Sequence, residues 1–172
     1  KATQSDIDTA VNELEIGGRN LLPENIPIYS LRWARVGMYE YKVKSGGDTF
    51  PLFYIQDYAE VGKQYTLSFE LKSTVDGAVF KNNTLYVNNA LTVTHNSPEL
   101  IKDKYVKVYG SFTYVEGGSY VHIYINGVTN ADELYLKKWK LEKGNKATDW
   151  TPAPEDVEAS IETAKTEAES AA

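Results

Sequence analysis

Tyrosine and tryptophan are numerous enough in this sequence, and suitably spaced, to form a ligand-binding surface. The chain of 172 residues holds 13 Tyr and three Trp, against five Phe and one Met. Both side chains combine a flat apolar ring with a polar edge, which suits strand surfaces and binding faces. Such rings stack on the C–H side of a pyranose while nearby amides, hydroxyls and carboxylates bind its hydroxyl groups. The composition favours a β-rich domain that binds carbohydrate, although solvent-facing strand positions also prefer Tyr without any ligand.

Two stretches place several rings at alternate positions. Residues 105–115 and 120–125 alternate in the way that half-buried strands do. Gly117-Gly118 between them predicts a hairpin turn, because glycine adopts positive φ without strain. If these strands pair, one outer face carries a platform of five rings: Tyr105, Tyr109, Tyr120, His122 and Tyr124. Trp33 and Tyr58 are further candidates for contact with a ligand.

Catalytic sites receive less support from the sequence. No Gly-rich phosphate loop or nucleophile elbow is present, and the absence of cysteine excludes disulfides and thiolate metal sites. His95 and His122 lack the paired spacing of a zinc site. A glycosidase needs only two suitably spaced carboxylates, and the sequence cannot place its candidates, which are Glu40, Asp57, Glu60, Glu70 and Glu116. We predict a protein that is not an enzyme and has no catalytic residues, metal ligands or cofactor.

Composition and net charge argue against some classes of binding partner. The apolar fraction is 42% and the charged fraction 24%, as in ordinary globular domains, and no apolar run is long enough for a membrane span. The net charge of −6 argues against nucleic acid, whose binding depends on clustered Lys and Arg. We expect one soluble core with neither a nucleic-acid partner nor membrane insertion.

Short strands must position the rings. Residues 65–72 alternate strictly between apolar and polar side chains. Weaker strand patterns occupy six further stretches: 34–43, 50–55, 78–80, 84–87, 91–94 and 134–141. Gly, Asn, Asp and Pro turns separate them without any helix between. This pattern predicts an all-β fold, a jelly-roll-type two-sheet β-sandwich.

Helical patterns flank the strands. Residues 5–16 carry apolar side chains at helical spacing until Gly17-Gly18, and a second such pattern follows Pro154, with Val157, Ile161, Ala164 and Ala168 on one seam. Narrow seams on both sides predict coiled-coil-like segments that make a homo-oligomer, whereas helices packed back on the domain are the alternative. We expect an N-terminal helical connector (1–16), a sandwich module (17–150), and a Pro linker with the start of a helical stalk (151–172), excised from a longer protein.

The borders of the expected sandwich carry a resemblance. Residues 16–22 (IGGRNLL) and 140–156 (KLEKGNKATDWTPAPED) resemble the borders of carbohydrate-binding-like jelly-roll modules in tail, baseplate and tail-fibre proteins of bacteriophages that infect Gram-positive bacteria. Residues 65–72 look like that family's YTLSF strand. The borders themselves are interpreted as structural, because Trp150, Pro152 and Pro154 would fix the direction in which the chain leaves the sandwich.

The resemblance implies a function and a location. It implies a non-catalytic host-adhesion module on the extracellular virion tail that recognises bacterial cell-wall polysaccharide beside other tail or baseplate subunits. Related jelly rolls often hold a structural calcium ion, although no acidic cluster in this sequence marks a site for one. The alternative is a structural spacer or decoration domain in a tail fibre with no ligand of its own.

Overall fold

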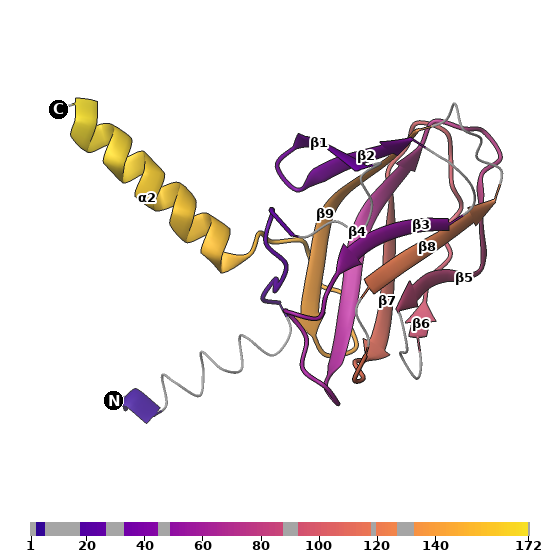
Figure 1. Ribbon diagram of the computed structural model, residues 1–172, viewed down its shortest axis with the longest axis horizontal. Helices are drawn as coiled ribbons and strands as arrows, with labels where there is room; N and C mark the ends of the chain where they lie inside the picture. Colours follow the sequence, from indigo (N-terminus) through magenta and orange to yellow (C-terminus); the bar gives the residue numbers. More distant parts are fainter. Residues whose placement is uncertain are drawn as a thin grey trace.

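The chain folds into nine described strands and one described helix (Figure 1). The computed structural model describes residues 3–5, 18–26, 33–44, 49–87, 93–117, 120–126 and 133–171. The strands are β1 (Trp33–Gly37), β2 (Glu40–Lys44), β3 (Thr49–Tyr54), β4 (Gln64–Ser73), β5 (Val79–Val87), β6 (Val93–His95), β7 (Val106–Thr113), β8 (Tyr120–Asn126) and β9 (Glu133–Lys143). The helix is α2 (Pro154–Ala171).

The strands form two antiparallel sheets. The larger has the order β1-β2-β9-β4-β7-β6 and the smaller has the order β3-β8-β5. From β2 to β6, and again from β7 to β9, consecutive strands lie in opposite sheets. This alternation is the jelly-roll arrangement, and it confirms the expected all-β two-sheet sandwich.

The expected hairpin between residues 105–115 and 120–125 is wrong. β7 pairs with β4 and β6 in the large sheet, whereas β8 pairs with β3 and β5 in the small sheet. A glycine pair between two alternating segments suits a hairpin and an arch between sheets equally, because both need only a tight change of direction. Tyr105 and Tyr109 therefore lie on the large sheet, whereas His122 and Tyr124 lie on the small sheet, on the opposite side of the sandwich.

Some of the weaker strand patterns form strands with other bounds than expected. Residues 34–43 form not one strand but the paired strands β1 and β2, which reverse at Met38 and at Tyr39, whose φ is 51°. Residues 78–80 and 84–87 belong to the single strand β5, whose register against β8 shifts between Phe80 and Leu85. Alternation alone reveals neither a tight turn whose two central residues are not Gly or Pro, nor a bulge inside a strand.

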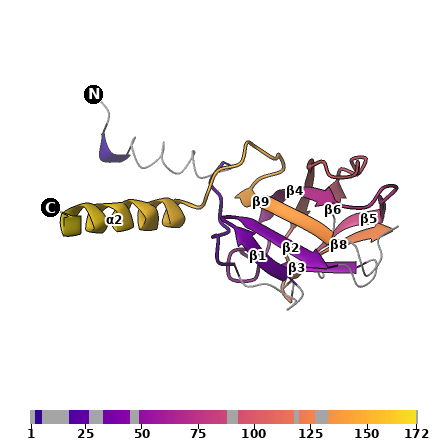
Figure 2. The same ribbon diagram turned by 90° about the horizontal axis from the view of Figure 1, so that it is seen from above.

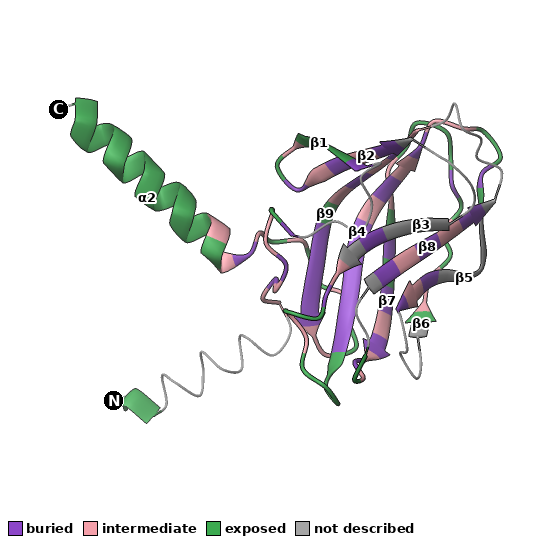
Figure 3. Ribbon diagram, viewed as in Figure 1, coloured by how far each residue is buried: buried purple, intermediate pink, exposed green. Residues whose placement is uncertain are grey.

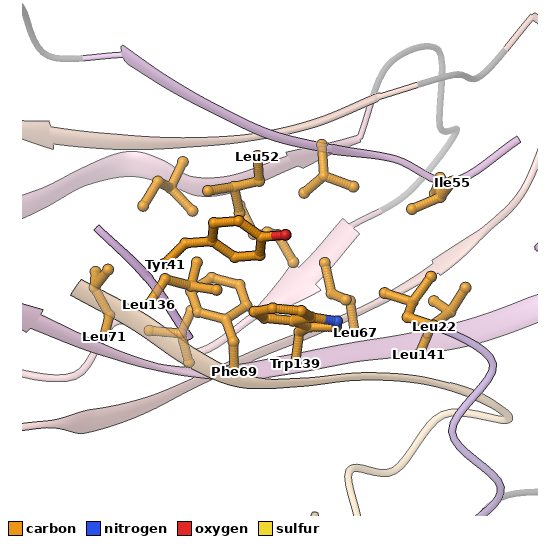
Figure 4. Close-up of a cluster of buried hydrophobic side chains, with 14 of the residues drawn as sticks. Leu22, Tyr41, Leu52, Ile55, Leu67, Phe69, Leu71, Leu136, Trp139 and Leu141 are labelled. Carbon is orange, nitrogen blue, oxygen red and sulfur yellow. The ribbon is translucent and has the colours of Figure 1, made fainter. Parts of the chain in front are cut away.

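The hydrophobic core fills the space between the two sheets (Figure 4). β4 and β9 lie at the centre of the large sheet and contribute the largest inward side chains, among them Phe69 and the fully buried Trp139. Leu52 of β3 faces them from the small sheet. The alternation in β4, β7, β8 and β9 thus places one set of side chains in the core and the other set on the outer faces.

The C-terminal helix is confirmed. α2 projects away from the sheets, and none of its side chains is buried (Figures 1, 2 and 3). Glu155 and Asp156 in its first turn are favourable beside the positive end of the helix dipole. The helix expected over residues 5–16 lies, apart from Ser5, outside the described residues. No described helix is long and apolar enough to cross a membrane.

Candidate functional site

The jelly roll divides the predicted ligand-binding residues. Tyr105 precedes β7 and Tyr109 lies within it on the outer face of the large sheet, where Tyr109 is 42% exposed. His122 and Tyr124 lie on the outer face of the small sheet, because their neighbours in β8 point into the core. Tyr120 pairs through its backbone with Tyr54, and its side chain is outside the described part.

The two remaining candidates belong to neither group. Trp33 is only 9% exposed and contributes its ring to the hydrophobic core. Tyr58 lies in the turn that follows β3, half-buried against the same core. Core packing therefore directs both rings, one at the start of a strand and the other in a turn.

Three rings form an aromatic platform on the outer face of the small sheet: Tyr86, His122 and Tyr124. Tyr86 lies directly opposite His122 in the pairing of β5 with β8. The His122 and Tyr124 ring centroids are 6.3 Å apart and the planes differ by 31°. Tyr86 meets both rings edge-on, with centroid distances of 6.2 Å. Sequence reasoning missed Tyr86, although its position between the apolar Leu85 and Val87 is a signal that it faces outward.

The aromatic platform is electrically neutral at ordinary pH. Burial lowers the pKa of His122 below its usual 6.5. Both nitrogens of its ring are shielded from solvent, so the imidazole contributes a flat uncharged surface between two phenols. All three side chains are half-buried, which leaves part of each ring accessible. Ligand sites commonly combine such apolar rings with a few polar groups, and the tyrosine hydroxyls supply polar groups here.

The outer face of the large sheet carries a different group, the lysine–tyrosine cluster, consisting of Lys72, Tyr105, Tyr135 and Lys137. The ammonium of Lys72 lies 4.9 Å from the centroid of the Tyr105 ring and 4.3 Å from that of Tyr135. The ammonium of Lys137 lies 3.8 Å from the same Tyr105 ring. These are cation–π contacts, which hold the lysine side chains against the sheet.

Carboxylates keep the two phenols of this cluster protonated. The Tyr105 hydroxyl donates to Glu40 at 3.0 Å, and burial together with this hydrogen bond raises the pKa of Tyr105. The Tyr135 hydroxyl donates to Glu133 at 2.6 Å, and that hydrogen bond, with a smaller effect of burial, raises the pKa of Tyr135. Tyr109 follows Tyr105 by four positions along the strand, a distance of about 13 Å, and is therefore separate from the cluster.

A third group of polar contacts joins the two ends of the sandwich, and we call it the entry–exit latch: Asn20, Tyr39, Glu142, Thr148 and Asp156. The buried amide of Asn20 donates to the carbonyls of Trp139 and Thr151, both at 2.9 Å, and its oxygen accepts from the backbone N–H groups of Leu22 and Leu141.

Carboxylates complete the entry–exit latch on both sides. Glu142 accepts hydrogen bonds from Gly18 at 3.1 Å and from the Thr148 hydroxyl at 2.7 Å. Asp156 in the first turn of α2 accepts from the Tyr39 hydroxyl and, at 2.8 Å, from the backbone of Glu24. These contacts agree with the interpretation that the two border motifs are structural.

The candidate glycosidase carboxylates are dispersed. Glu40 and Glu70 lie on the outer face of the large sheet, where Glu40 is hydrogen-bonded to Tyr105 and Glu70 lies 3.5 Å from Lys138. Asp57, Glu60 and Glu116 lie in the turns that follow β3 and β7. In the part of the chain that the structure describes, no group of three or more His, Asp or Glu side chains could hold a metal ion.

Comparisons with known proteins concern the backbone. No family model matches the chain, and no curated protein matches it significantly. The baseplate tripod (BppUct-A-L) of bacteriophage Tuc2009 superposes with a TM-score of 0.48 and 14% identity over 82% of this chain and 61% of its own, so this chain spans less than two thirds of that one.

Two further structures contain carbohydrate-binding domains. The CBM22-1 xylan-binding domain of Paenibacillus barcinonensis Xyn10C has a TM-score of 0.42 and 12% identity over 77% of this chain and 93% of its own. The tandem CBM22-1-CBM22-2 domain of the same protein has a TM-score of 0.43 and 13% identity over 79% of this chain and 44% of its own. All three TM-scores are below 0.5, so the jelly-roll assignment rests on the two sheets of this chain.

Proposed function

We propose that the chain is a non-catalytic carbohydrate-binding module of a phage tail protein, which attaches the virion to polysaccharide on the bacterial cell wall. The observation that carries this proposal is the aromatic platform, in which Tyr86, His122 and Tyr124 present uncharged rings on one outer face. The resemblance of residues 16–22 and 140–156 to phage-module borders supports the location on the tail.

The chemistry of the platform suits neutral sugar rings. Pyranose C–H groups pack on aromatic faces, and the hydroxyls of Tyr86 and Tyr124 can exchange hydrogen bonds with sugar hydroxyls. A shallow platform of this kind binds weakly, because it buries little of the ligand. Several copies on an oligomeric stalk would raise the overall affinity by a factor of about 100 or more through effective concentration.

A structural spacer remains the second candidate, and the entry–exit latch favours it. The latch ties both ends of the sandwich and the first turn of α2 to one another, which suits a module that transmits the direction of a fibre. Arg19 and Glu155, which lie 2.6 Å apart, add a salt bridge between the two border segments. A spacer needs this latch and no exposed rings.

Binding to purified Gram-positive wall polysaccharide separates the two candidates. The test compares the full chain with the Tyr86→Ala/Tyr124→Ala double variant, and Tyr109→Ala is the control because this exposed ring lies on the opposite face. We expect the double variant to bind at least about tenfold more weakly, which corresponds to 1.4 kcal/mol, while the control is unchanged.

Two other results would decide against this proposal. Absence of wild-type binding to wall polysaccharide from every strain in a panel favours the spacer. Release of reducing sugar by the wild type contradicts the non-catalytic assignment.

A further inference from the structure

The lysine–tyrosine cluster lies on the opposite face from the aromatic platform. Three carboxylates near it already interact with hydroxyl groups or lysines of the same sheet. Glu40 accepts the Tyr105 hydroxyl, and Glu70 lies 3.5 Å from Lys138. Glu133 accepts the Tyr135 hydroxyl at 2.6 Å and lies 3.8 Å from Lys42. Glu40, Glu70 and Glu133 therefore each have a donor or cation within the sheet, whereas Asp103 acts on Tyr135 only through its charge.

The two lysines of the cluster are held by rings and not by carboxylates. Lys72 and Lys137 both approach the Tyr105 ring, at 4.9 and 3.8 Å from its centroid. Neither ammonium forms an ion pair within 4.0 Å in the described part of the chain. A cation–π contact orders a lysine without cancelling its charge, so a later anionic ligand finds both cations already positioned.

Charge is unevenly distributed over the molecule. The helix α2 contains six acidic side chains and one lysine, and therefore holds five of the six net negative charges. The described outward side chains around the cluster have the opposite balance, by a margin of one: Lys42, Lys72, Lys107, Lys137 and Lys138 against Glu40, Glu70, Asp103 and Glu133. The acidity of the whole chain is therefore no obstacle to an anionic ligand at this face.

We propose that Lys72 and Lys137 form a second ligand site, which binds the repeating anionic groups of a polyanionic chain. The two ammonium groups share the ring of Tyr105, so the distance between them cannot exceed the sum of their distances to its centroid. Successive carboxylates or phosphodiesters of one chain can therefore interact with one ammonium group each. Tyr105 and Tyr135 are the positioning residues that hold the cations in place.

The ligand of this site is a chain because a single exposed ion pair is weak. Such pairs contribute about 0–1 kcal/mol each, and salt screens them. Repetition of the charge along a polymer supplies the remaining affinity through rebinding. The inference goes beyond the proposed function, since it needs neither the aromatic platform nor a neutral sugar.

The test measures binding of the full chain to three polymers at low ionic strength: polygalacturonate, poly(glycerol phosphate) and neutral dextran. We expect wild-type binding to at least one of the two anionic polymers, little to dextran, and a steep loss of binding as salt rises through about 0.15 M. The anionic polymer that is preferred identifies carboxylate or phosphodiester as the source of the charge.

Two double variants decide whether this site is responsible. Lys72→Gln/Lys137→Gln is expected to bind the anionic polymer at least about tenfold more weakly. The control Lys63→Gln/Lys165→Gln removes the same charge from exposed positions outside the cluster and is expected to bind as the wild type does. Unfolding temperatures within a few degrees of the wild type show that both variants fold.

The outcomes that overturn the proposal are equally definite. They are equal weakening in the two double variants, unchanged binding in Lys72→Gln/Lys137→Gln, and no wild-type binding to either anionic polymer. Tyr86→Ala/Tyr124→Ala must leave polyanion binding unchanged. Failure of this site can therefore be told apart from failure of the aromatic platform.

Discussion

Individual buried side chains set the pH response of this protein, and His122 is the clearest case. Burial lowers the pKa of His122 in the folded state, whereas the unfolded chain has the ordinary value near 6.5. As the pH falls below about 6.5, the unfolded chain takes up a proton that the folded chain does not. His122 therefore contributes stability at neutral pH that is lost as the pH falls through its folded-state pKa.

A substitution tests this linkage. We expect the free energy of unfolding of the wild type to fall between about pH 7 and pH 5 by more than that of His122→Gln, because carboxylates common to both titrate mainly below that range. Urea unfolding at several pH values measures the difference. Identical pH profiles for the two proteins would contradict the assignment of the lowered pKa.

Tyr39 is a central member of the entry–exit latch. Its buried hydroxyl contacts Asp156 and accepts a hydrogen bond from the backbone N–H of Ala153 at 2.8 Å. Burial, with the neighbouring Asp156 as a further cause, raises the pKa of Tyr39, so the phenol stays protonated.

Removal of this hydroxyl destabilises the fold. Tyr39→Phe leaves a buried N–H group without its acceptor, and we expect a loss of about 1–3 kcal/mol in the free energy of unfolding. Tyr109→Phe is the matched control, since the Tyr109 ring is 42% exposed, and its stability should not change. Equal stability of the two variants, measured by urea unfolding, would contradict the stabilising role of Tyr39 in the latch.

At the level of the elements, the strand β7 packs against the small sheet at Gly110. A Cβ atom built on Gly110 would lie 2.5 Å from a methyl carbon of Leu85 in β5 and 3.3 Å from the Cβ of His95. Leu85 is itself buried in the core, so it has little room to move.

This close approach predicts an overpacked core in Gly110→Ala. We expect the substitution to reduce the free energy of unfolding by about 1–3 kcal/mol. Gly62→Ala is not a suitable control, because Gly62 has a φ of 82°. Tyr109→Phe on the outer face of β7, where the ring is 42% exposed, is the better comparison, and thermal unfolding of both variants gives the result. A Gly110→Ala protein as stable as the wild type would mean that the two sheets separate easily.

The helix α2 presents its apolar seam to solvent. Val157 is 42% exposed and Ile161 is 63% exposed, and the seam continues through Ala164 and Ala168. An apolar seam left open along a helix favours a coiled-coil arrangement, in which the same helix of another copy covers it.

Oligomerisation through this seam is the expected consequence. Val157→Asn/Ile161→Asn should shift the mass measured by light scattering toward the monomer, whereas Glu158→Gln/Glu162→Gln should not. A monomeric wild type at micromolar concentration would show that α2 alone does not assemble the stalk.

At the scale of the whole molecule, the sandwich separates the two proposed ligand sites. The aromatic platform belongs to the small sheet and the lysine–tyrosine cluster to the large sheet, with the hydrophobic core between them. Sites without shared contacts contribute independently to free energy.

Adhesion to whole cells tests this independence. When Tyr86→Ala/Tyr124→Ala is combined with Lys72→Gln/Lys137→Gln, the losses of binding free energy should add within about 0.5 kcal/mol. A cell-binding titration of the four proteins measures the coupling. A combined loss no greater than the larger single loss would indicate one continuous site instead of two.

The sequence was sufficient to predict single strands and helices, because these depend mainly on neighbours along the chain. The strict alternation of residues 65–72 predicted the strand β4, and the spacing of Val157 and Ile161 predicted the helix α2. It also indicated that His122 and Tyr124 share one face, because side chains two positions apart in a strand point the same way.

The neighbours of each strand in the sheets could not be predicted from the sequence. Alternation states which side chains share a face but not which strand lies beside them, so the crossing between β7 and β8 could not be distinguished from a hairpin. Tyr86 meets His122, and Lys72 meets Tyr135, only because strands distant in the sequence pair in the sheets. These pairings are favoured because connections that cross between the sheets bury the apolar faces of both sheets in one core. No single stretch of sequence encodes that requirement.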